Sequence, residues 1–387
     1  MTAGLLGRKL GHSLSPQIHR FFGDYEYKLY EREPEEVEKF VRDSGLDFFN
    51  VTIPYKAVVA GLCDELTPLA QRLGNVNFVV RLQDGRLRGD NTDYFGFERL
   101  LDSALERAGI GVPKRAAVLG AGGAATTAKT VLEDHGANVS TIRRGELPSQ
   151  DAELVVNATP VGMHPDDDGR RIDISEFPNC RIVLDLVYNP SPTRLVREAR
   201  ECGKTAEDGM AMLVAQAYRA FCLASPPDKA SGNIYLYGPP ASGKSTWARI
   251  IAAATGLAFV DLDDEIVRTE GRAIAKIFAD DGEAAFRSME KDALRRISSQ
   301  RGKIVALGGG ALLDGASRRI AETTGRVVLL DCPEDELLRR ASRSDARPLL
   351  SGDAAERLHS LLAARRDHYA SFARTFPFVS KLQVGRR

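Results

Sequence analysis

The chain has 387 residues, of which 43% are apolar and 27% are charged, a composition typical of globular proteins with two or three domains at this length. The 53 basic side chains balance the 53 acidic ones, so the charge gives no support for binding nucleic acid or an anionic membrane. No apolar run approaches the ~18 residues that a membrane span needs, and the N-terminus does not resemble a signal peptide. Five scattered cysteines without a C-x-x-C pair favour reduced thiols, and we therefore expect a cytoplasmic protein.

Three polar clusters lie in the first hundred residues. They are S-L-S-P at 13–16, N-V-T-I-P-Y-K at 50–56 and G-D-N-T-D at 89–93. Each cluster by itself is typical of a turn or a helix cap. A single lysine such as Lys56 is more often a surface charge than a catalyst, so only the combination of these clusters with later segments points to a site.

The next segment alternates short apolar runs with a helical stretch. Strands are predicted at 116–119, 139–142, 154–156 and 182–186, and a helix at 124–135. Strands that alternate with helices form parallel sheets with right-handed crossovers. The pattern therefore predicts an α/β lobe of the Rossmann type.

A glycine-rich loop joins the first of these strands to the helix. Its residues are Gly120, Gly122, Gly123 and Ala124. Such a loop lets the backbone approach a pyrophosphate, although the glycines alone are a weak signal. An NAD site would carry an acidic residue at the end of the next strand, whereas this sequence has Arg143 and Arg144. Paired guanidinium groups fit the 2′-phosphate of NADP, with a solvated strand-end pair as the alternative.

The clearest domain boundary lies at 225–232, S-P-P-D-K-A-S-G, which is rich in Pro, Ser and Gly. A segment of this length reaches about 26 Å at most, so it is a short linker. Residues 1–224 form one predicted unit. Within it, about 1–100 and the helical region of about 205–224 form one lobe, and about 101–204 the Rossmann-type lobe. Residues 233–387 form a smaller α/β domain.

A second phosphate site follows the linker. Apolar runs at 234–237, 258–260, 304–307 and 327–330 alternate with helical segments and predict another parallel sheet. The first run leads into G-P-P-A-S-G-K-S at 238–245, which fits the P-loop pattern in its strand–loop–helix context. Backbone amides would hold the phosphates of ATP, Lys244 would reach the β- and γ-oxygens, and Ser245 would bind Mg²⁺. The residues of this predicted site are Gly238, Gly243, Lys244, Ser245 and Thr246.

Other polar segments follow the later strands of this domain. D-L-D-D at 261–264 stands where parallel sheets bind ligands, but for this segment taken alone a helix N-cap is the better explanation. G-G-G at 308–310 permits a close approach of backbone to a ligand, with a plain turn as the default. The basic stretch at 339–348 fits either a lid over phosphates or a solvated loop.

Residues from Asn233 to about Val379 resemble the shikimate kinase family. The resemblance rests on the P-loop, on F-x-D-x-D at 259–263, on the three glycines, on R-P-L-L at 347–350 and on the arginine and tyrosine at 365 and 369. It implies Mg²⁺- and ATP-dependent phosphorylation of shikimate. The implied roles are Asp261 at the metal, Asp263 at the shikimate hydroxyls, Arg287 and Arg365 at the carboxylate, Gly309 and Gly310 at the substrate pocket, Arg347 at the transferring phosphate and Arg340 at the adenine.

The kinase-like half departs from the family in two places. Ala241 stands in the P-loop where the family usually has glycine, which restricts the backbone. The chain also ends just after a predicted strand at 378–379, so we expect the family's closing helix to be absent. These departures leave an alternative in which the kinase-like half is a catalytically dead module that binds shikimate or nucleotide for regulation.

The stretch from Gly4 to Phe221 resembles the shikimate dehydrogenase family. The three early polar clusters match it, as do N-A-T-P-x-G-M at 157–163, D-L-V-Y-N-P at 185–190 and G-M-A-M-L-V-x-Q at 209–216. The resemblance implies NADPH-dependent reduction of 3-dehydroshikimate, with Lys56 and Asp93 as the catalytic pair. The implied substrate-binding residues are Ser13 and Ser15 at the carboxylate, Asn50, Thr52, Asn77 and Gln216 at the ring oxygens, and Tyr188 at the pocket wall.

The two resemblances rest on separate residues, yet the product implied for the first half is the substrate implied for the second. We therefore predict a bifunctional enzyme of aromatic amino acid biosynthesis whose partners are small molecules. The agreement favours shikimate over quinate for the dehydrogenase half, and quinate remains a weaker alternative.

Overall fold

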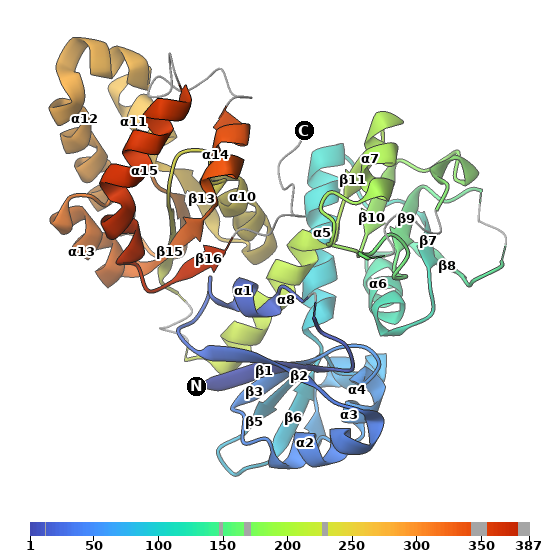
Figure 1. Cartoon of the computed structure of the whole chain (residues 1–387). Helices are drawn as coiled ribbons and strands as arrows, with labels where there is room; N and C mark the ends of the chain where they lie inside the picture. Colours follow the sequence, from blue (N-terminus) through green and yellow to red (C-terminus); the bar gives the residue numbers. More distant parts are fainter. Residues whose placement is uncertain (12, 147–149, 166–171, 227–230, 342–353, 378–387) are drawn as a thin grey trace.

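The computed structural model describes residues 1–11, 13–146, 150–165, 172–226, 231–341 and 354–377. The chain forms three sheets, each covered by helices, and two long helices, α5 and α8, run between them (Figure 1). No helix within the described ranges is long and apolar enough to cross a membrane.

The first sheet is mixed, with the strand order β2-β1-β3-β5-β6-β4. β5 runs antiparallel to both β3 and β6, whereas the other pairs are parallel. Its strands are β1 (Thr2–Gly7), β2 (Glu26–Glu31), β3 (Phe48–Val51), β4 (Glu65–Leu66), β5 (Phe78–Arg81) and β6 (Leu87–Asp90). Its helices are α1 (Ser15–His19), η1 (Pro34–Glu36), α2 (Val37–Asp43), α3 (Lys56–Ala60) and α4 (Pro68–Leu73). Two of the early polar clusters therefore lie at strand ends of this sheet.

The second sheet is fully parallel, in the order β11-β10-β9-β7-β8, which confirms the Rossmann-type prediction. Its central strands are almost entirely buried and rich in Val, Leu and Ile, as a sheet covered on both faces requires. The elements are β7 (Arg115–Leu119), α6 (Gly123–Asp134), β8 (Asn138–Ile142), β9 (Leu154–Asn157), η2 (Ile174–Glu176), β10 (Ile182–Asp185), α7 (Arg194–Glu201) and β11 (Thr205–Glu207). The last strand extends this lobe beyond the expected boundary at about 204.

Two helices connect the first and second sheets. They are α5 (Thr92–Ala108) and α8 (Met210–Ala224), which pack along each other. Gly96 permits their close approach, because a Cβ at this position would lie 2.9 Å from the Met212 carbonyl oxygen. α5 carries Asp93 in its first turn and α8 carries Gln216, so this helix pair holds site residues as well as the lobes.

The third sheet is also parallel, in the order β13-β14-β12-β15-β16. The four predicted strands are confirmed. The elements are β12 (Asn233–Tyr237), α10 (Lys244–Thr255), β13 (Ala258–Asp261), α11 (Leu262–Glu270), α12 (Ile274–Ser298), β14 (Lys303–Ala306), α13 (Gly315–Thr324), β15 (Gly325–Asp331), α14 (Glu334–Ala341), α15 (Ala354–Ala370) and β16 (Thr375–Pro377). The last described strand lies just before the predicted strand at 378–379, which is outside the described residues.

Candidate active sites

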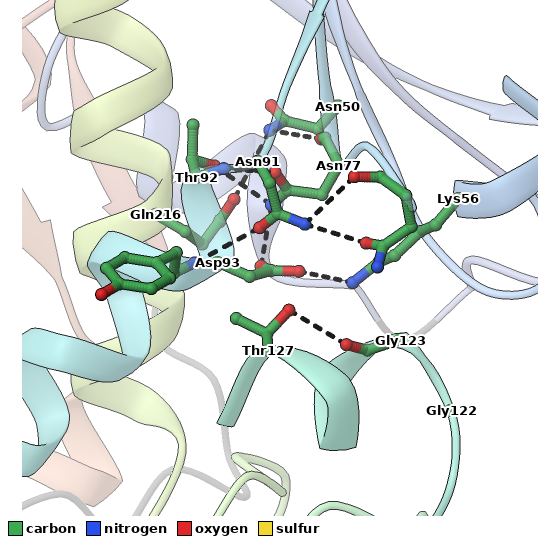
Figure 2. A network of polar contacts seen from close by, with 12 residues as sticks. Asn50, Lys56, Asn77, Asn91, Thr92, Asp93, Gly122, Gly123, Thr127 and Gln216 are labelled. Carbon is green, nitrogen blue, oxygen red and sulfur yellow. Dashed lines mark hydrogen bonds and ion pairs between the residues drawn. The ribbon is translucent and has the colours of Figure 1, made fainter. Parts of the chain in front are cut away.

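Lys56 and Asp93 form an ion pair between helices α3 and α5. Lys56 begins α3 and Asp93 lies in the first turn of α5. The Lys56 Nζ atom is 2.5 Å from Asp93 Oδ2, and the two side chains are only 15% and 10% exposed (Figure 2). Burial of this kind shields a pair from solvent and salt. The Lys56 side chain is therefore held in a fixed place.

Asparagine side chains hold the start of α5. Asn77 Nδ2 donates to Asp93 Oδ1 at 2.7 Å, and Asn77 Oδ1 accepts from the Thr92 amide at 2.6 Å (Figure 2). Asn91 caps the helix by accepting from the Tyr94 amide, and its Nδ2 donates to Asn75 Oδ1 at 2.8 Å. Because both asparagine networks end on this turn, the Asp93 carboxylate has little freedom to move.

The sequence did not identify Asn75 and Asn91 as residues that hold the start of α5. Asn91 carried a usable signal, because asparagine directly before a helix is a preferred N-cap. Asn75 carried none, since its contact with Asn91 joins the segment before β5 to the residue that follows β6.

The predicted ring-binding residues Asn50 and Gln216 come together from distant segments. Asn50 Nδ2 lies 3.4 Å from Gln216 Oε1, and Tyr27 donates from its hydroxyl to Asn50 Oδ1 at 2.9 Å. The ring of His19 stacks on Tyr27 at 3.9 Å, and burial lowers the pKa of His19 to about 3. The Asn50 oxygen faces the Tyr27 hydroxyl, so Asn50 presents its NH₂ group towards Gln216.

The predicted carboxylate-binding serines lie beside the Rossmann-type lobe. Ser13 Oγ donates to Ser15 Oγ at 3.1 Å, and the Ser15 amide donates to Ser13 Oγ. Tyr188, which follows β10, shares a hydrogen bond with Ser13, and burial raises the pKa of the Tyr188 phenol. The phenol therefore stays protonated. Thr52, directly after β3, packs its methyl group close to Gly7.

The glycine loop lies against the Lys56–Asp93 pair. Gly120 has a φ of +118°, and a Cβ there would lie 3.1 Å from the Ala158 carbonyl oxygen, so the turn requires glycine. A Cβ on Gly123 would lie 3.5 Å from Lys56 Cδ, and Figure 2 shows this loop facing the pair. Helix α6 begins at Gly123 without a side-chain cap, as a site for pyrophosphate requires. A dinucleotide held on this loop would thus reach the ion pair.

Arg143 and Arg144 follow β8 and are exposed. They stand beside the glycine loop, because the Gly120 amide donates to the carbonyl of Ile142, the last residue of β8. Ala124 is in the first turn of α6. The predicted cofactor residues are therefore placed along one edge of the second sheet.

The P-loop and the following helix have the form that a nucleotide site requires. Gly243 adopts a φ of +95° just before α10, and Thr246 lies in the first turn. Lys244 Nζ donates to the carbonyl oxygens of Gly238 and Pro239 at 2.9 and 2.8 Å. Ser245 Oγ donates to Asp261 Oδ2 at 2.6 Å. A hydroxyl and a carboxylate side by side fit Mg²⁺, which takes few protein oxygens and keeps several waters.

Ala241 adopts the left-handed backbone conformation that glycine favours. Its φ is +64°, and its side chain packs against the apolar cluster of Cys332, Leu337 and Leu358. A left-handed conformation costs an L-residue about 1–2 kcal/mol. The P-loop therefore keeps its shape with alanine in place of glycine, but the strained backbone lowers the stability of the fold.

Replacing Ala241 by glycine should stabilise the third-sheet domain by about 1 kcal/mol, because the backbone strain disappears while only one methyl contact is lost. Thermal unfolding followed by circular dichroism measures this gain. Ala252→Gly in the regular part of α10 is the matched control and should destabilise, since glycine weakens a helix interior. A loss of stability in the Ala241 variant would show that the methyl packing outweighs the strain.

The predicted substrate residues of this domain surround the loop at 308–310. A Cβ on Gly310 would lie 2.8 Å from both terminal nitrogens of Arg287, and one on Gly308 would lie 3.4 Å from Asp263 Oδ1. Arg365 Nη1 donates to the Gly309 carbonyl at 2.9 Å. Two guanidinium groups and one carboxylate thus meet at the three glycines, which carry no side chains. This arrangement is suited to binding a small hydroxylated acid.

Glu290 is a buried neighbour of Arg287 to which the sequence assigned no role. It is 3% exposed, and Arg287 Nη1 lies 2.8 Å from its Oε2 atom. Burial raises the pKa of Glu290, whereas Arg287 lowers it. Its position three residues after Arg287 on α12 was the available signal, because such residues are neighbours on a helix. Glu290 orients the Arg287 guanidinium group through this ion pair.

Arg340, predicted at the adenine end, donates to the carbonyl oxygens of Ala241 and Ser242, both at 3.4 Å. It therefore lies on the outer side of the P-loop. Arg347, predicted at the transferring phosphate, is outside the described residues.

These sites define a chain that joins a dinucleotide-dependent oxidoreductase to a P-loop phosphotransferase. Residues 5–79 match the family model of the shikimate dehydrogenase substrate binding domain, and residues 240–382 match that of shikimate kinase. The shikimate dehydrogenase (NADP(+)) of Clostridium beijerinckii is 35% identical over 246 residues, covering 56% of this chain and 89% of that protein. The chain belongs to the shikimate dehydrogenase family and carries a shikimate kinase domain as well.

Solved structures agree with this assignment. The shikimate 5-dehydrogenase of Thermus thermophilus in complex with NADP(H) and shikimate is 30% identical, with a TM-score of 0.52 over 59% of this chain and 97% of that chain. A quinate dehydrogenase from Corynebacterium glutamicum in complex with NAD is 28% identical, with a TM-score of 0.51 over 58% of this chain and 93% of that chain.

Proposed function

We propose that the chain reduces 3-dehydroshikimate to shikimate with NADPH and then phosphorylates shikimate at its 3-hydroxyl with ATP and Mg²⁺. The observation that carries the proposal is the presence of two assembled sites in one chain. One site holds the Lys56–Asp93 pair against a glycine loop, and the other holds a P-loop beside Asp263 and Arg287. The product of the first reaction is the substrate of the second.

In the first site, Lys56 acts as the general acid. Bound NADPH supplies the hydride, and addition to a ketone leaves negative charge on oxygen. The Lys56 ammonium stabilises that charge and donates its proton to the oxygen. Asp93 orients Lys56 through their ion pair, while Asn77 holds the other Asp93 oxygen. Asn50, Thr52, Gln216, Ser13, Ser15 and Tyr188 bind the remaining oxygens of the substrate.

In the second site, Asp263 accepts the proton of the attacking hydroxyl. Bound ATP and Mg²⁺ supply the phosphoryl group and neutralise its charge. Lys244 holds the phosphate oxygens, and Ser245 and Asp261 are the residues that would hold Mg²⁺. Arg287 and Arg365 orient the carboxylate of shikimate, and Gly309 and Gly310 line the substrate pocket. By resemblance, Arg347 acts at the transferring phosphate and Arg340 near the adenine.

The selection of NADPH over NADH rests on Arg143 and Arg144. Their exposed guanidinium groups stand beside the glycine loop, where a 2′-phosphate would lie. The domain assignment is residues 1–224 for the dehydrogenase, 225–232 for the linker and 233–387 for the kinase. We place the enzyme in the cytoplasm, with small-molecule substrates as its partners.

A coupled assay tests the proposal. The purified chain is mixed with 3-dehydroshikimate, NADPH, ATP and Mg²⁺, and NADPH loss and ADP release are followed together. Both should depend on the carbon substrate, and ADP release should also start with shikimate alone. No ADP release with shikimate would favour the dead-kinase alternative. Faster oxidation of quinate than of shikimate, or preference for NADH, would contradict the assignment of the first half.

A further inference from the structure

The two halves of the chain share one hydrophobic core. Buried residues of α8 in the dehydrogenase half and of α10 in the kinase half belong to the same apolar cluster, and the two helices pack along each other (Figure 1). α8 carries Gln216 of the first site, and α10 begins with Lys244 and Ser245 of the second. The interface therefore joins elements that hold both sites.

Phe21 inserts into the kinase half. This residue follows α1, is fully buried, and lies with its ring 5.6 Å from Trp247 and 4.7 Å from Phe376 between centroids. Trp247 and Phe376 are in turn 4.6 Å apart. Trp247 stands one turn after the P-loop lysine on α10. Aromatic clusters of this geometry add stabilisation beyond their buried area.

Arg99 holds the other end of the P-loop helix. It projects from α5, and its Nε and Nη2 atoms donate to the Ala253 carbonyl at 3.1 and 2.8 Å. The last carbonyl groups of a helix lack partners within the helix and favour a cation. α5 is the helix that begins with the Asp93 turn of the first site. Arg99 thus ties the C-terminal end of α10 to the dehydrogenase half.

We propose that Phe21 and Arg99, residues of the dehydrogenase half, are positioning residues for the kinase site. They contact α10 on its side and at its C-terminal end, and a helix of this length moves as a rigid rod. A displacement at either contact would shift Lys244 and Ser245 at its start. Errors of about 1 Å in such positions cost about 10²-fold in rate. The inference rests on the proposed kinase function.

Arg99→Ala in the full chain is the first test. It should lower kcat/KM for ATP in shikimate phosphorylation roughly tenfold, since a smaller shift than 1 Å is expected when Phe21 remains. Reduction of 3-dehydroshikimate should stay within about twofold of the wild type, because no contact of Lys56 or Asp93 is removed. Arg107→Ala is the matched control, as Arg107 lies on the same helix but pairs with Glu207 inside the dehydrogenase half.

Trp247 supplies a second readout that does not depend on activity. It is the one tryptophan of the chain and is 7% exposed, so its fluorescence reports the interface directly. The milder variant Phe21→Leu should shift its emission to longer wavelength and increase acrylamide quenching. Phe40→Leu, which alters a buried phenylalanine on α2 away from the interface, should not.

The outcomes separate the two proposals. Unchanged kinase constants in Arg99→Ala and unchanged Trp247 emission in Phe21→Leu would overturn the positioning role. If the wild-type chain shows no shikimate-dependent ATP turnover, the proposed kinase function fails. Weaker binding of ATP by Arg99→Ala than by the wild type, measured by calorimetry, would then still support positioning of the P-loop, and equal binding would refute it.

Discussion

Lys56→Met is expected to lower kcat for reduction of 3-dehydroshikimate by about 10³-fold, because the variant loses both the general acid and the cation that stabilises the oxyanion. Methionine keeps much of the lysine's length and avoids a cavity beside Gly123. The measurement is the steady-state rate of NADPH oxidation. Phosphorylation of added shikimate should continue at the wild-type rate, since the ion pair of Lys56 lies within the dehydrogenase half.

The appropriate control is Lys39→Met, which removes an exposed lysine that pairs with Asp43 on α2. An exposed ion pair of this type is worth little, so this variant should behave as the wild type. A loss of less than tenfold in the Lys56 variant would refute its role as the acid. An increase in KM alone, with kcat unchanged, would assign it to substrate binding only.

The second large effect is expected for Asp263→Asn, which should lower kcat for ATP-dependent phosphorylation of shikimate by about 10²–10⁴-fold. Asparagine keeps the size of the side chain but accepts no proton at neutral pH, so the attacking hydroxyl loses its base. ADP release in the presence of shikimate measures the effect. Reduction of 3-dehydroshikimate is the internal reference for correct folding.

The adjacent Asp264 provides the matched control. It is exposed on α11, whereas Asp263 lies beside Gly308. Asp264→Asn should therefore change phosphorylation by no more than about twofold. Equal losses in both variants would attribute the effect to the N-terminal charge of α11, because both carboxylates lie in the first turn of that helix.

The nucleotide sites could be predicted from short stretches of sequence. The P-loop and the glycine loop are each contiguous, and both follow a strand and begin a helix, so local backbone preferences determine their form. The parallel strands around these loops are apolar on both faces, so each could be predicted from a short contiguous apolar run. The first sheet was not predicted, because its strands are short, and their mixed pairing depends on contacts between distant residues.

Ala241 shows the limit of local inference. The sequence predicted a restricted backbone in the P-loop, yet Ala241 takes the left-handed conformation. The surrounding loop, together with packing on Leu337 and Leu358, overrides the local preference. Glu290 is a similar case, because its role depends on where α12 places Arg287.

The sequence by itself determined the two families, the parallel α/β halves and the residue types of both sites, since these depend on contiguous motifs. Tertiary structure alone decided which side chains meet. Lys56 and Asp93, Asn50 and Gln216, and Phe21 and Trp247 are far apart in the chain and come together only through packing of helices against sheets. The contact between the two halves has no sequence motif, because burial of apolar surface is non-directional and many partners would satisfy it.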